Sequence, residues 1–486
     1  MPISRKAGVL FALQEPLIAP AILDAMSDNP SNLTEPIPPD LNGGIDPSEQ
    51  PNPMLGEPET VEAVGAEGVG TGMPGIEAPQ GRRAAATFIF LTVALDMLAM
   101  GMILPVLPKL IEGFVNGNDA KTATWLGIFG TLFAGMQFFF SPVLGSLSDR
   151  YGRRPIVLLS NFGLGCDYIV MALAPTLPWL FLGRVISGLT ASSVPTAMAY
   201  MADVTPPEKR AGAFGMLNAA FGVGFVLGPA LGGVLGNVNP RLPFWIAAVL
   251  SLLNGMYGLF VLPESLKAEH RSRFSWKRAN PIGSLQLFRS VKGVLPLAFL
   301  LLLGYIAQQS LMSAYMIYVY SRYHWTAQTG GLSLAVVGIV TGIYGAMLVK
   351  PAVKWIGERR SILLGYVGGA IGYWMFGFSK TGLLVWLGIP LLNLMSIAWP
   401  AAQSIMSKVI PPNQQGALQG ATNSLRGIAG LIGPSLFTRV FADSLGVHPV
   451  FPTEGAPFYL AGLMLVAGLV LLFMSSIGRP VEVPAA

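Results

Sequence analysis

The chain has 486 residues, of which 52% are hydrophobic and only 11% are charged, and its mean hydropathy is +0.57. Soluble domains carry about 25% charged residues, so this composition excludes an ordinary soluble protein and favours a lipid surrounding. The formal net charge of +5 is modest and its basic residues lie in short segments between apolar ones, which argues against a nucleic-acid partner. The single cysteine, Cys166, excludes an intrachain disulfide.

Residues 1–84 differ from the rest of the chain. From residue 29 to residue 83 the sequence is rich in proline, glycine and acidic residues and has no periodic apolar face. Such a segment buries too little apolar surface to offset the entropy of ordering. We predict that residues 1–84 form a disordered N-terminal extension.

Twelve apolar segments follow, each long enough for a membrane-spanning helix, which needs about 20 residues. They are residues 86–111, 123–146, 156–175, 178–201, 209–236, 243–262, 294–319, 332–354, 361–379, 383–405, 416–440 and 457–477. The sequence therefore predicts an all-α membrane protein with twelve transmembrane helices.

A polar loop at residues 264–293 divides these segments six and six. This division predicts an N-terminal six-helix bundle at residues 85–263, a C-terminal six-helix bundle at residues 294–478 and a short tail at residues 479–486. If the connections are sorted alternately by side, twenty Lys and Arg residues fall on the side of the central loop and six on the other. Because basic residues concentrate on the cytoplasmic side, both termini and the central loop are expected to be cytoplasmic.

The loop after the second segment combines closely spaced glycines with charges that could control access to a central path. These residues are Gly145, Asp149, Arg150, Gly152, Arg153 and Arg154. Glycine permits close backbone approach, and the Asp149 carboxylate can bond helix N-terminal amides or pair with an arginine. A basic anchor obeying the charge rule would explain the arginines but not this spacing.

The fifth segment contains a run of small residues around a proline. Its members are Gly224, Gly228, Pro229, Gly232 and Gly233, with a weaker echo in the eleventh segment at Gly430, Gly433 and Pro434. Small residues let membrane helices pack closely, and a proline can kink a helix.

These two patterns together resemble the major facilitator superfamily, and the run in the fifth segment is similar to that of its drug/proton antiporters. A degenerate copy of the loop at residues 357–360 fits a duplicated fold. Shorter stretches at residues 104–108, 166–168, 202–210 and 416–420 look closest to the tetracycline efflux proteins. The resemblance implies a monomeric bacterial inner-membrane transporter that exports a small amphipathic compound in exchange for protons by alternating access. It implies no cofactor, no bound metal and no enzymatic activity.

Charged residues inside the apolar segments are functional candidates because burying a charge in a bilayer is costly. The resemblance assigns proton coupling to Asp96 and Asp167, with Arg184 as a counter-charge to one of them. The alternatives are an aspartate bonded to Ser or Thr at a helix interface and a fixed ion pair. Asp203, at the end of the fourth segment, is expected to pair with the loop arginines as part of a gate.

Three further polar residues are predicted to contact substrate. Gln137 and Gln309 stand where the resembling pumps also carry glutamine, although either could instead bond a neighbouring helix. Arg426 lies deep in the eleventh segment without an acid in segments 7 to 12 to neutralise it. The alternatives are that it bonds helix carbonyls, that it extends toward the cytoplasmic side, or that it pairs with a carboxylate across the bundle interface. A further alternative is that it faces the cavity and selects substrates with an anionic group. Tyr305, Tyr315, Tyr318 and Trp399 are candidates for stacking on a ring, although aromatic residues in membrane helices also serve as packing or interface residues.

One position departs from the tetracycline pumps. Their ninth helix carries an acid where this sequence has Gly369, which puts tetracycline itself in question as a substrate. Two other functions stay open on the sequence alone. The first is an uptake symporter or facilitator for a small metabolite, and the second is a receptor or scaffold without transport, which the intramembrane charges disfavour.

Overall fold

The computed structural model describes residues 80–272, 274, 283–291, 293–411 and 414–474. Within these residues every regular element is helical and no strand occurs, which confirms the all-α prediction for this part of the chain. Residues 1–79 of the predicted extension, parts of the central loop and the predicted tail lie outside the described residues. The first helix begins at Gln80, inside the range predicted for the extension.

The helices of the first half precede the central loop. They are α1 Gln80–Ile103, α2 Leu107–Phe114, α3 Asp119–Tyr151, α4 Arg153–Leu173, α5 Leu177–Thr190, α6 Ser193–Val204, α7 Arg210–Val238 and α8 Leu242–Val261. A short helix α9 Gln286–Ser290 lies within the loop. The second half comprises α10 Val294–Ser313, α11 Tyr315–Tyr323, α12 Ala327–Ile343, the π-helical turn η4 Tyr344–Leu348, α13 Val349–Phe378, α14 Gly382–Asn393, α15 Met395–Val409, α16 Gln415–Ser444 and α17 Ala456–Met474.

Ten helical stretches of the described chain are long and apolar enough to cross a membrane. The stretch Ala327–Phe378 covers the eighth and ninth predicted segments together, because a break at Gly357, with φ of 79°, lies inside a continuous helical assignment. Helix α16 covers the eleventh predicted segment, and its polar residues keep it outside the ten. All twelve predicted segments therefore correspond to helices in the described part of the chain.

Every third segment is broken into two helices. The breaks separate α1 from α2 at Leu104–Val106, α5 from α6 at Ala191–Ser192, α10 from α11 at Ala314 and α14 from α15 at Leu394. Broken helices in transporters occur where the backbone is buried in protein or lines a cavity. This spacing of three divides each half into two three-helix units, a regularity that the sequence analysis did not detect.

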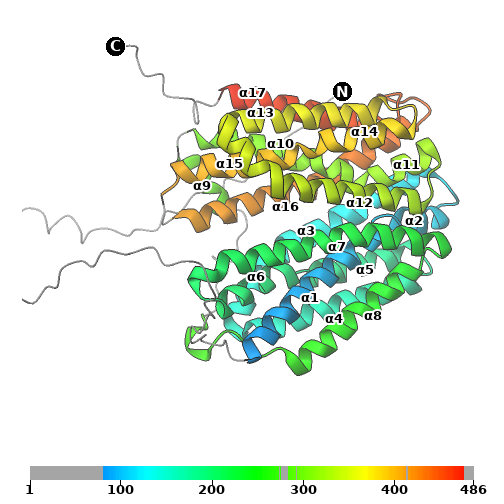
Figure 1. Cartoon of the computed structure of the whole chain (residues 1–486). Helices are drawn as coiled ribbons and strands as arrows, with labels where there is room; N and C mark the ends of the chain where they lie inside the picture. Colours follow the sequence, from blue (N-terminus) through cyan, green and yellow to red (C-terminus); the bar gives the residue numbers. More distant parts are fainter. Residues whose placement is uncertain (1–79, 273, 275–282, 292, 412–413, 475–486) are drawn as a thin grey trace, which may run out of the picture. The chain divides into compact units, whose positions relative to one another are not determined.

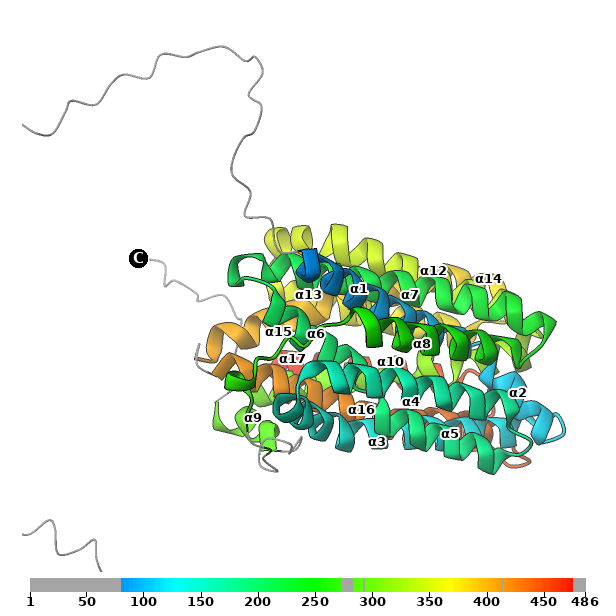
Figure 2. The ribbon, with the colours of Figure 1, turned by 90° about the horizontal axis from the view of Figure 1, so that it is seen from below.

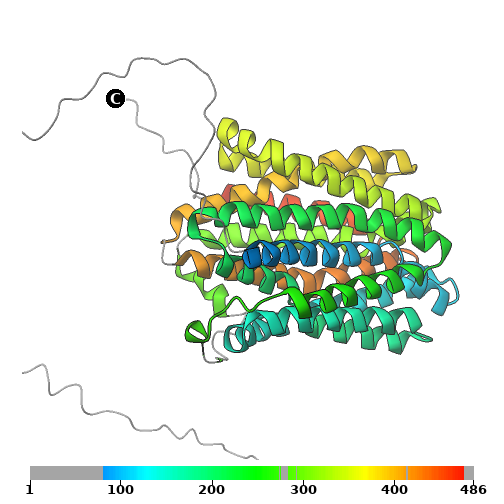
Figure 3. The ribbon, with the colours of Figure 1, turned by 60° about the horizontal axis from the view of Figure 1, so that its bottom comes forward.

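The two halves form adjacent groups of helices that run side by side, blue to green and yellow to red in Figure 1. Two helix pairs make the most extensive contacts between the halves: α7 packs on α12, and α3 packs on α16. Helix α3 also contacts α10 and α11. The view from below in Figure 2 and the intermediate view in Figure 3 show the same lengthwise packing.

The halves touch closely near one end of these pairs. There the Tyr320 hydroxyl donates to the Pro105 carbonyl, and the Thr131 and Ser435 hydroxyl oxygens lie 2.7 Å apart across the interface. We call this end the Pro105 end. The other end, which carries Asp149 to Arg154, is called the Arg153 end.

Toward the Arg153 end, glycines of these helices have open space around them. A Cβ atom built on Gly145 of α3, Gly215 of α7, Gly345 of η4 or Gly416 of α16 would meet no atom within 4 Å. By contrast, a Cβ on Gly331 would lie 2.2 Å from the Pro229 carbonyl oxygen in the other half. The described contacts between the halves therefore concentrate toward the Pro105 end, whereas these glycines near the Arg153 end have open space around them.

Candidate functional site

Asp96 lies in the middle of α1 with 4% of its surface exposed. The hydroxyl of Ser193, the first residue of α6, is its side-chain hydrogen-bonding neighbour, whereas its Oδ2 atom has no partner among the described residues. The ion pairs found in the described part of the chain do not include Asp96. The structure thus places an uncompensated carboxylate beside the break between α5 and α6, a position that fits reversible proton binding.

Asp167 lies on α4 and is fully buried, but unlike Asp96 it has a cationic partner. The Arg184 Nη2 atom of α5 donates to Asp167 Oδ2 at 3.1 Å, and the guanidinium also lies 5.7 Å from the centre of the Phe133 ring. Gly183 makes room for the carboxylate, since a Cβ there would lie 2.6 Å from Asp167 Oδ1. Arg184 was expected to pair with either Asp96 or Asp167, and the structure pairs it with Asp167.

The two glutamines occupy different surroundings. Gln137 on α3 is exposed, and its amide donates to the Ala191 carbonyl at 3.5 Å, at the break after α5. Gln309 on α10 packs against α16, where a Cβ on Gly433 would lie 2.4 Å from the Gln309 Cβ. Gln309 therefore lies near the junction of the halves, where a Cβ on Gly430 would meet both its amide nitrogen and Ala134 of α3, whereas the hydrogen bond of Gln137 lies within the first half.

Arg426 has an exposed side chain whose guanidinium carbon lies 5.0 Å from the centre of the Tyr305 ring. Tyr305 in turn contacts the Trp399 ring, with 5.8 Å between ring centres. Cation–π contact with tyrosine partly stabilises the charge of Arg426 but leaves its hydrogen-bond donors available. No carboxylate of the described residues lies within 4 Å of the guanidinium nitrogens, as expected from the sequence.

The loop between α3 and α4 forms a charged cluster at the Arg153 end. Arg153 pairs with Asp149 at 2.5 Å and with Asp203 of α6 at 3.2 Å, so the expected pairing of Asp203 with a loop arginine is present. Arg150 lies over the Tyr151 ring at 5.0 Å. Asp149 therefore takes the second of its two expected roles, pairing with an arginine.

The role of bonding helix amides belongs to Glu264, which the sequence analysis did not single out. Its carboxylate accepts from the Arg153 and Arg154 backbone amides at 2.8 and 3.2 Å, so it stabilises the N-terminus of α4. Gly152, with φ of 110°, makes this approach possible, since a Cβ there would lie 2.2 Å from Glu264 Oε2. The only available signal was an acid directly after the sixth segment.

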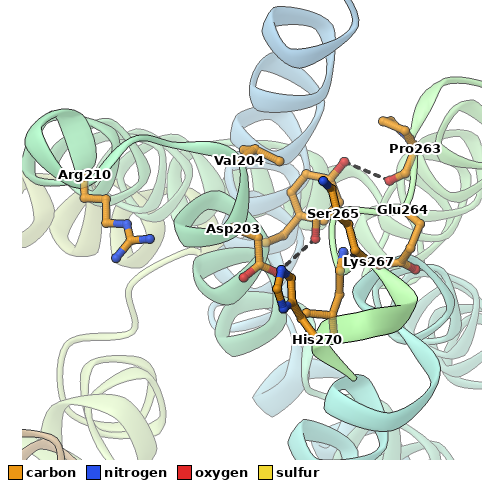
Figure 4. Close-up of a pocket in the computed structure, with 10 residues that line it drawn as sticks. Asp203, Val204, Arg210, Pro263, Glu264, Ser265, Lys267 and His270 are labelled. Atoms are coloured by element: carbon orange, nitrogen blue, oxygen red, sulfur yellow. Dashed lines mark hydrogen bonds between the residues drawn. The ribbon is translucent and has the colours of Figure 1, made fainter. Parts of the chain in front are cut away.

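Beside the charged cluster is a cavity of about 480 Å³ between α6, the start of α7 and the residues after α8. Figure 4 shows the Ser265 hydroxyl donating to Asp203 at its wall. The Tyr200 hydroxyl donates to the Pro263 carbonyl. The other lining residues are Val204, Arg210, Glu264, Leu266, Lys267 and His270. Its lining mixes both signs of charge, so we assign it to the loop cluster and not to a substrate path.

The degenerate copy in the second half repeats this geometry. Gly357 has φ of 79°, and the residue after it, Glu358, pairs with Lys408 at the end of α15. Arg359 donates to the Leu472 carbonyl of α17, as Arg154 donates to the Leu259 carbonyl of α8. The two loops are therefore structural counterparts.

The glycines of α7 create two interfaces on two different faces of that helix. Toward α1, a Cβ on Gly224, Gly228 or Gly232 would lie 2.4, 2.7 or 2.2 Å from backbone atoms of Ala94, Gly101 or Met102. Toward α12, a Cβ on Gly233 would lie 2.5 Å from the Ala327 carbonyl oxygen, in the other half. The small residues thus hold α7 between α1 and the second half.

Comparison with known proteins places the chain among transporters. Residues 89–434 match the family model described as Major Facilitator Superfamily. The tetracycline resistance protein of class C from Escherichia coli is 38% identical over 379 residues, which cover 76% of this chain and 93% of that protein. The class G protein from Vibrio anguillarum is 35% identical, with 75% and 92% covered.

A crystal structure of the human organic anion transporter MFSD10 (TETRAN) shares the fold, with a TM-score of 0.60 and 22% identity over 81% of this chain and all of that chain. The chain therefore belongs to the Major Facilitator Superfamily, and within it to the family of the tetracycline resistance proteins. It is a multi-pass membrane transporter and not an enzyme.

Proposed function

We propose that the chain is a secondary active transporter that exports a small amphipathic compound, such as a tetracycline-like drug, in exchange for protons. Its family supports drug export, because the curated relatives are tetracycline resistance proteins. The single observation that carries proton exchange is Asp96, a buried carboxylate without a cationic partner among the described residues. No observation favours the alternative of uptake.

In this proposal Asp96 binds the proton, and the break between α5 and α6 couples proton binding to helix movement. Ser193, which hydrogen-bonds Asp96, is the first residue after that break. Asp167 and Arg184 act differently, because their ion pair fixes α4 against α5 and shapes the environment of the first bundle. Gln137 and Gln309 supply amide groups that can bond a polar drug.

Alternating access requires the two halves to close at one end while they open at the other. The contacts at the Pro105 end and the open space around glycines near the Arg153 end support an inward-facing arrangement in this structure, if the Arg153 end is cytoplasmic. The cluster of Gly145, Asp149, Arg150, Gly152, Arg153, Arg154 and Asp203 is then part of the cytoplasmic gate. The glycine run of α7 keeps the opposite end closed.

The proposed setting is a bacterial inner membrane, in which the chain acts as a monomer. The basic residues of the Arg153 end place that end of the bundle on the cytoplasmic side. Cysteine labelling tests this orientation in a Cys166→Ser background, since Cys166 is exposed. Cysteines at Thr176, Asn239 or Thr381 should react with an impermeant reagent from outside intact cells, and cysteines at Tyr151 or Ser272 should not. The reverse pattern would overturn the orientation.

The substrate need not be tetracycline. Gly369 of α13 is tightly packed: a Cβ there would lie 2.4 Å from Met395 and 2.9 Å from Leu465. The acid that the resembling pumps are expected to carry at this position would therefore require the Met395 and Leu465 side chains to shift.

The deciding experiment measures drug susceptibility in a host that lacks its own pumps, with and without this protein. Everted membrane vesicles then show whether transport of the compound dissipates a proton gradient across the vesicle membrane. Resistance together with compound-dependent proton movement supports the proposal. Uphill export that persists after the proton gradient is collapsed would contradict it.

A further inference from the structure

We propose that Tyr305, Trp399, Gln403 and Arg426 form a subsite of the second bundle that binds an anionic group attached to an aromatic ring. This inference rests on the proposed transport function and specifies the class of substrate. Figure 1 shows the three helices that supply these residues, α10, α15 and α16, within the second half.

The position of Arg426 on α16 is the first argument. Residues three and four apart share a helix face, and seven residues make nearly two turns, so Arg426 lies on the face of Gly430 and Gly433. A Cβ on Gly430 would lie 3.3 Å from both Ala134 of α3 and Gln309 of α10. This face therefore looks toward the junction between the halves, and Arg426 lies one turn closer to the Arg153 end.

The second argument is a set of donors without acceptors. The Trp399 Nε1 and Gln403 Nε2 atoms are buried and have no hydrogen-bond partner among the described residues. Gln403 is one turn after Trp399 on α15, and the hydroxyl oxygen of Thr422, one turn before Arg426 on α16, lies 3.4 Å from its Oε1 atom. The same hydroxyl has a shorter contact, 2.9 Å, with the Leu418 carbonyl oxygen, to which it donates. The Gln403 amide therefore lies beside α16 with a nitrogen that has no partner among the described residues.

The third argument is that these groups are all hydrogen-bond donors and need an acceptor. Arg426, Trp399 Nε1 and Gln403 Nε2 can only donate, and no carboxylate of the described residues pairs with Arg426. Buried donors are costly when their hydrogen bonds remain unmade. A ligand that brings several acceptor oxygens and a negative charge would satisfy them, and the planar guanidinium suits a carboxylate or a sulfonate.

The aromatic rings complete the subsite. Tyr305 lies between the Arg426 guanidinium at 5.0 Å and the Trp399 ring at 5.8 Å, so a flat ligand has apolar surface beside the charge. In the structure Trp399 Nε1 and Gln403 Nε2 are shielded, whereas Arg426 is exposed. A ligand therefore contacts Arg426 first and the two shielded donors of α15 afterwards.

The test uses purified full-length protein and three probes with one ring system: 2-naphthoate, 2-naphthamide and 2-naphthylmethylammonium. Calorimetric titration at neutral pH should give roughly ten-fold or more tighter binding of the carboxylate than of the amide, as expected for a charge-assisted hydrogen bond. Arg426→Gln should remove this preference while the affinity for the amide stays unchanged. Trp399→Phe, which keeps a ring but removes the N–H, should weaken carboxylate binding by several-fold.

Arg439→Gln is the matched control, because Arg439 is an exposed arginine further along the same helix; it should keep the full preference. If Arg426→Gln does not fold, Arg426→Lys, which keeps the charge but loses the fork, should show an intermediate preference. Equal binding of all three probes by the unaltered protein, no binding of 2-naphthoate, or an unchanged preference in Arg426→Gln would overturn the subsite. Failure of proton-driven export with the charge preference intact would instead refute the proposed function.

Discussion

The two halves of the molecule differ in the charges that they carry inside the bundle. Helices of the first half bury Asp96 and the ion pair of Asp167 with Arg184, so one acid there has no counter-charge among the described residues. The helices α10 to α17 contain an acid only at Glu358 in the break of α13 and at Asp443 near the end of α16. The second half instead presents Arg426. From this difference we infer that the first bundle binds the proton and the second bundle selects the charge of the substrate.

The loops at the Arg153 end show the same architecture with the signs exchanged. In the first half a basic loop residue, Arg153, pairs with the acidic Asp203 at the end of α6. In the second half the acidic Glu358 pairs with the basic Lys408 at the end of α15. Duplication therefore preserved where the loop meets the helix end, while the sign of each partner was free to change as long as the pair stayed complementary.

The largest expected effect is the loss of export when Asp96 is replaced, whereas replacement of Asp167 should act on stability. Asp96→Asn should abolish gradient-driven export in everted vesicles without loss of protein, because an amide cannot bind and release a proton as a carboxylate does. Asp443→Asn, at an exposed acid of the second half, is the control and should transport normally. Normal gradient-driven export by a well-folded Asp96→Asn protein would contradict the inference that the first bundle binds the proton and the second selects the substrate.

Asp167→Asn is expected to act on stability. It leaves Arg184, with only 12% of its side chain exposed, without its partner, which should cost about 3–5 kcal/mol of unfolding free energy. The double variant Asp167→Asn with Arg184→Gln should recover most of this loss, because no buried charge then remains. Thermal unfolding in detergent measures both; a double variant as unstable as the single one would contradict a simple ion pair.

Replacing a tightly packed glycine by alanine should lower the stability of the protein more at Gly232 in the first half than at Gly433 in the second half. Gly232→Ala should destabilise the protein by about 1–3 kcal/mol, because the new methyl group meets the Met102 backbone. Gly433→Ala should cost less, since its methyl group meets the Gln309 side chain, which can shift. Gly222→Ala, on α7 with open space around it, is the control and should be neutral or slightly stabilising. Thermal unfolding of the three variants measures these differences, and equal losses at all three positions would remove the distinction.

The smallest effect concerns the exchanged charges. Lys408→Glu should slow transport modestly and change stability by about 1 kcal/mol or less, as exposed ion pairs do. Adding Glu358→Lys should restore the rate, because the pair is complementary again. The corresponding exchange of Arg153 and Asp203 should not restore it, since Arg153 also bonds Asp149 and Ser148. Restoration in both halves would show that only the sign of the pair matters.

The sequence by itself determined the membrane class, the twelve helical segments and the family. Apolar length is sufficient for this because the bilayer requires every backbone group to be satisfied within a helix. Residue spacing also located the charged loop, the run of glycines on α7 and the acids at Asp96 and Asp167. These features are local, so a linear pattern can reveal them.

Tertiary structure decided which of these residues meet. The sequence could not choose between Asp96 and Asp167 as the partner of Arg184, because both lie on helices that neighbour the bundle interior. It left Asp149 with a choice of roles and missed Glu264, which is 111 residues from the amide of Arg153 that it bonds. It also missed the breaks in every third segment and the partners of Arg426. Such contacts depend on the packing of helices that are distant along the chain, and hydropathy contains no information about that packing.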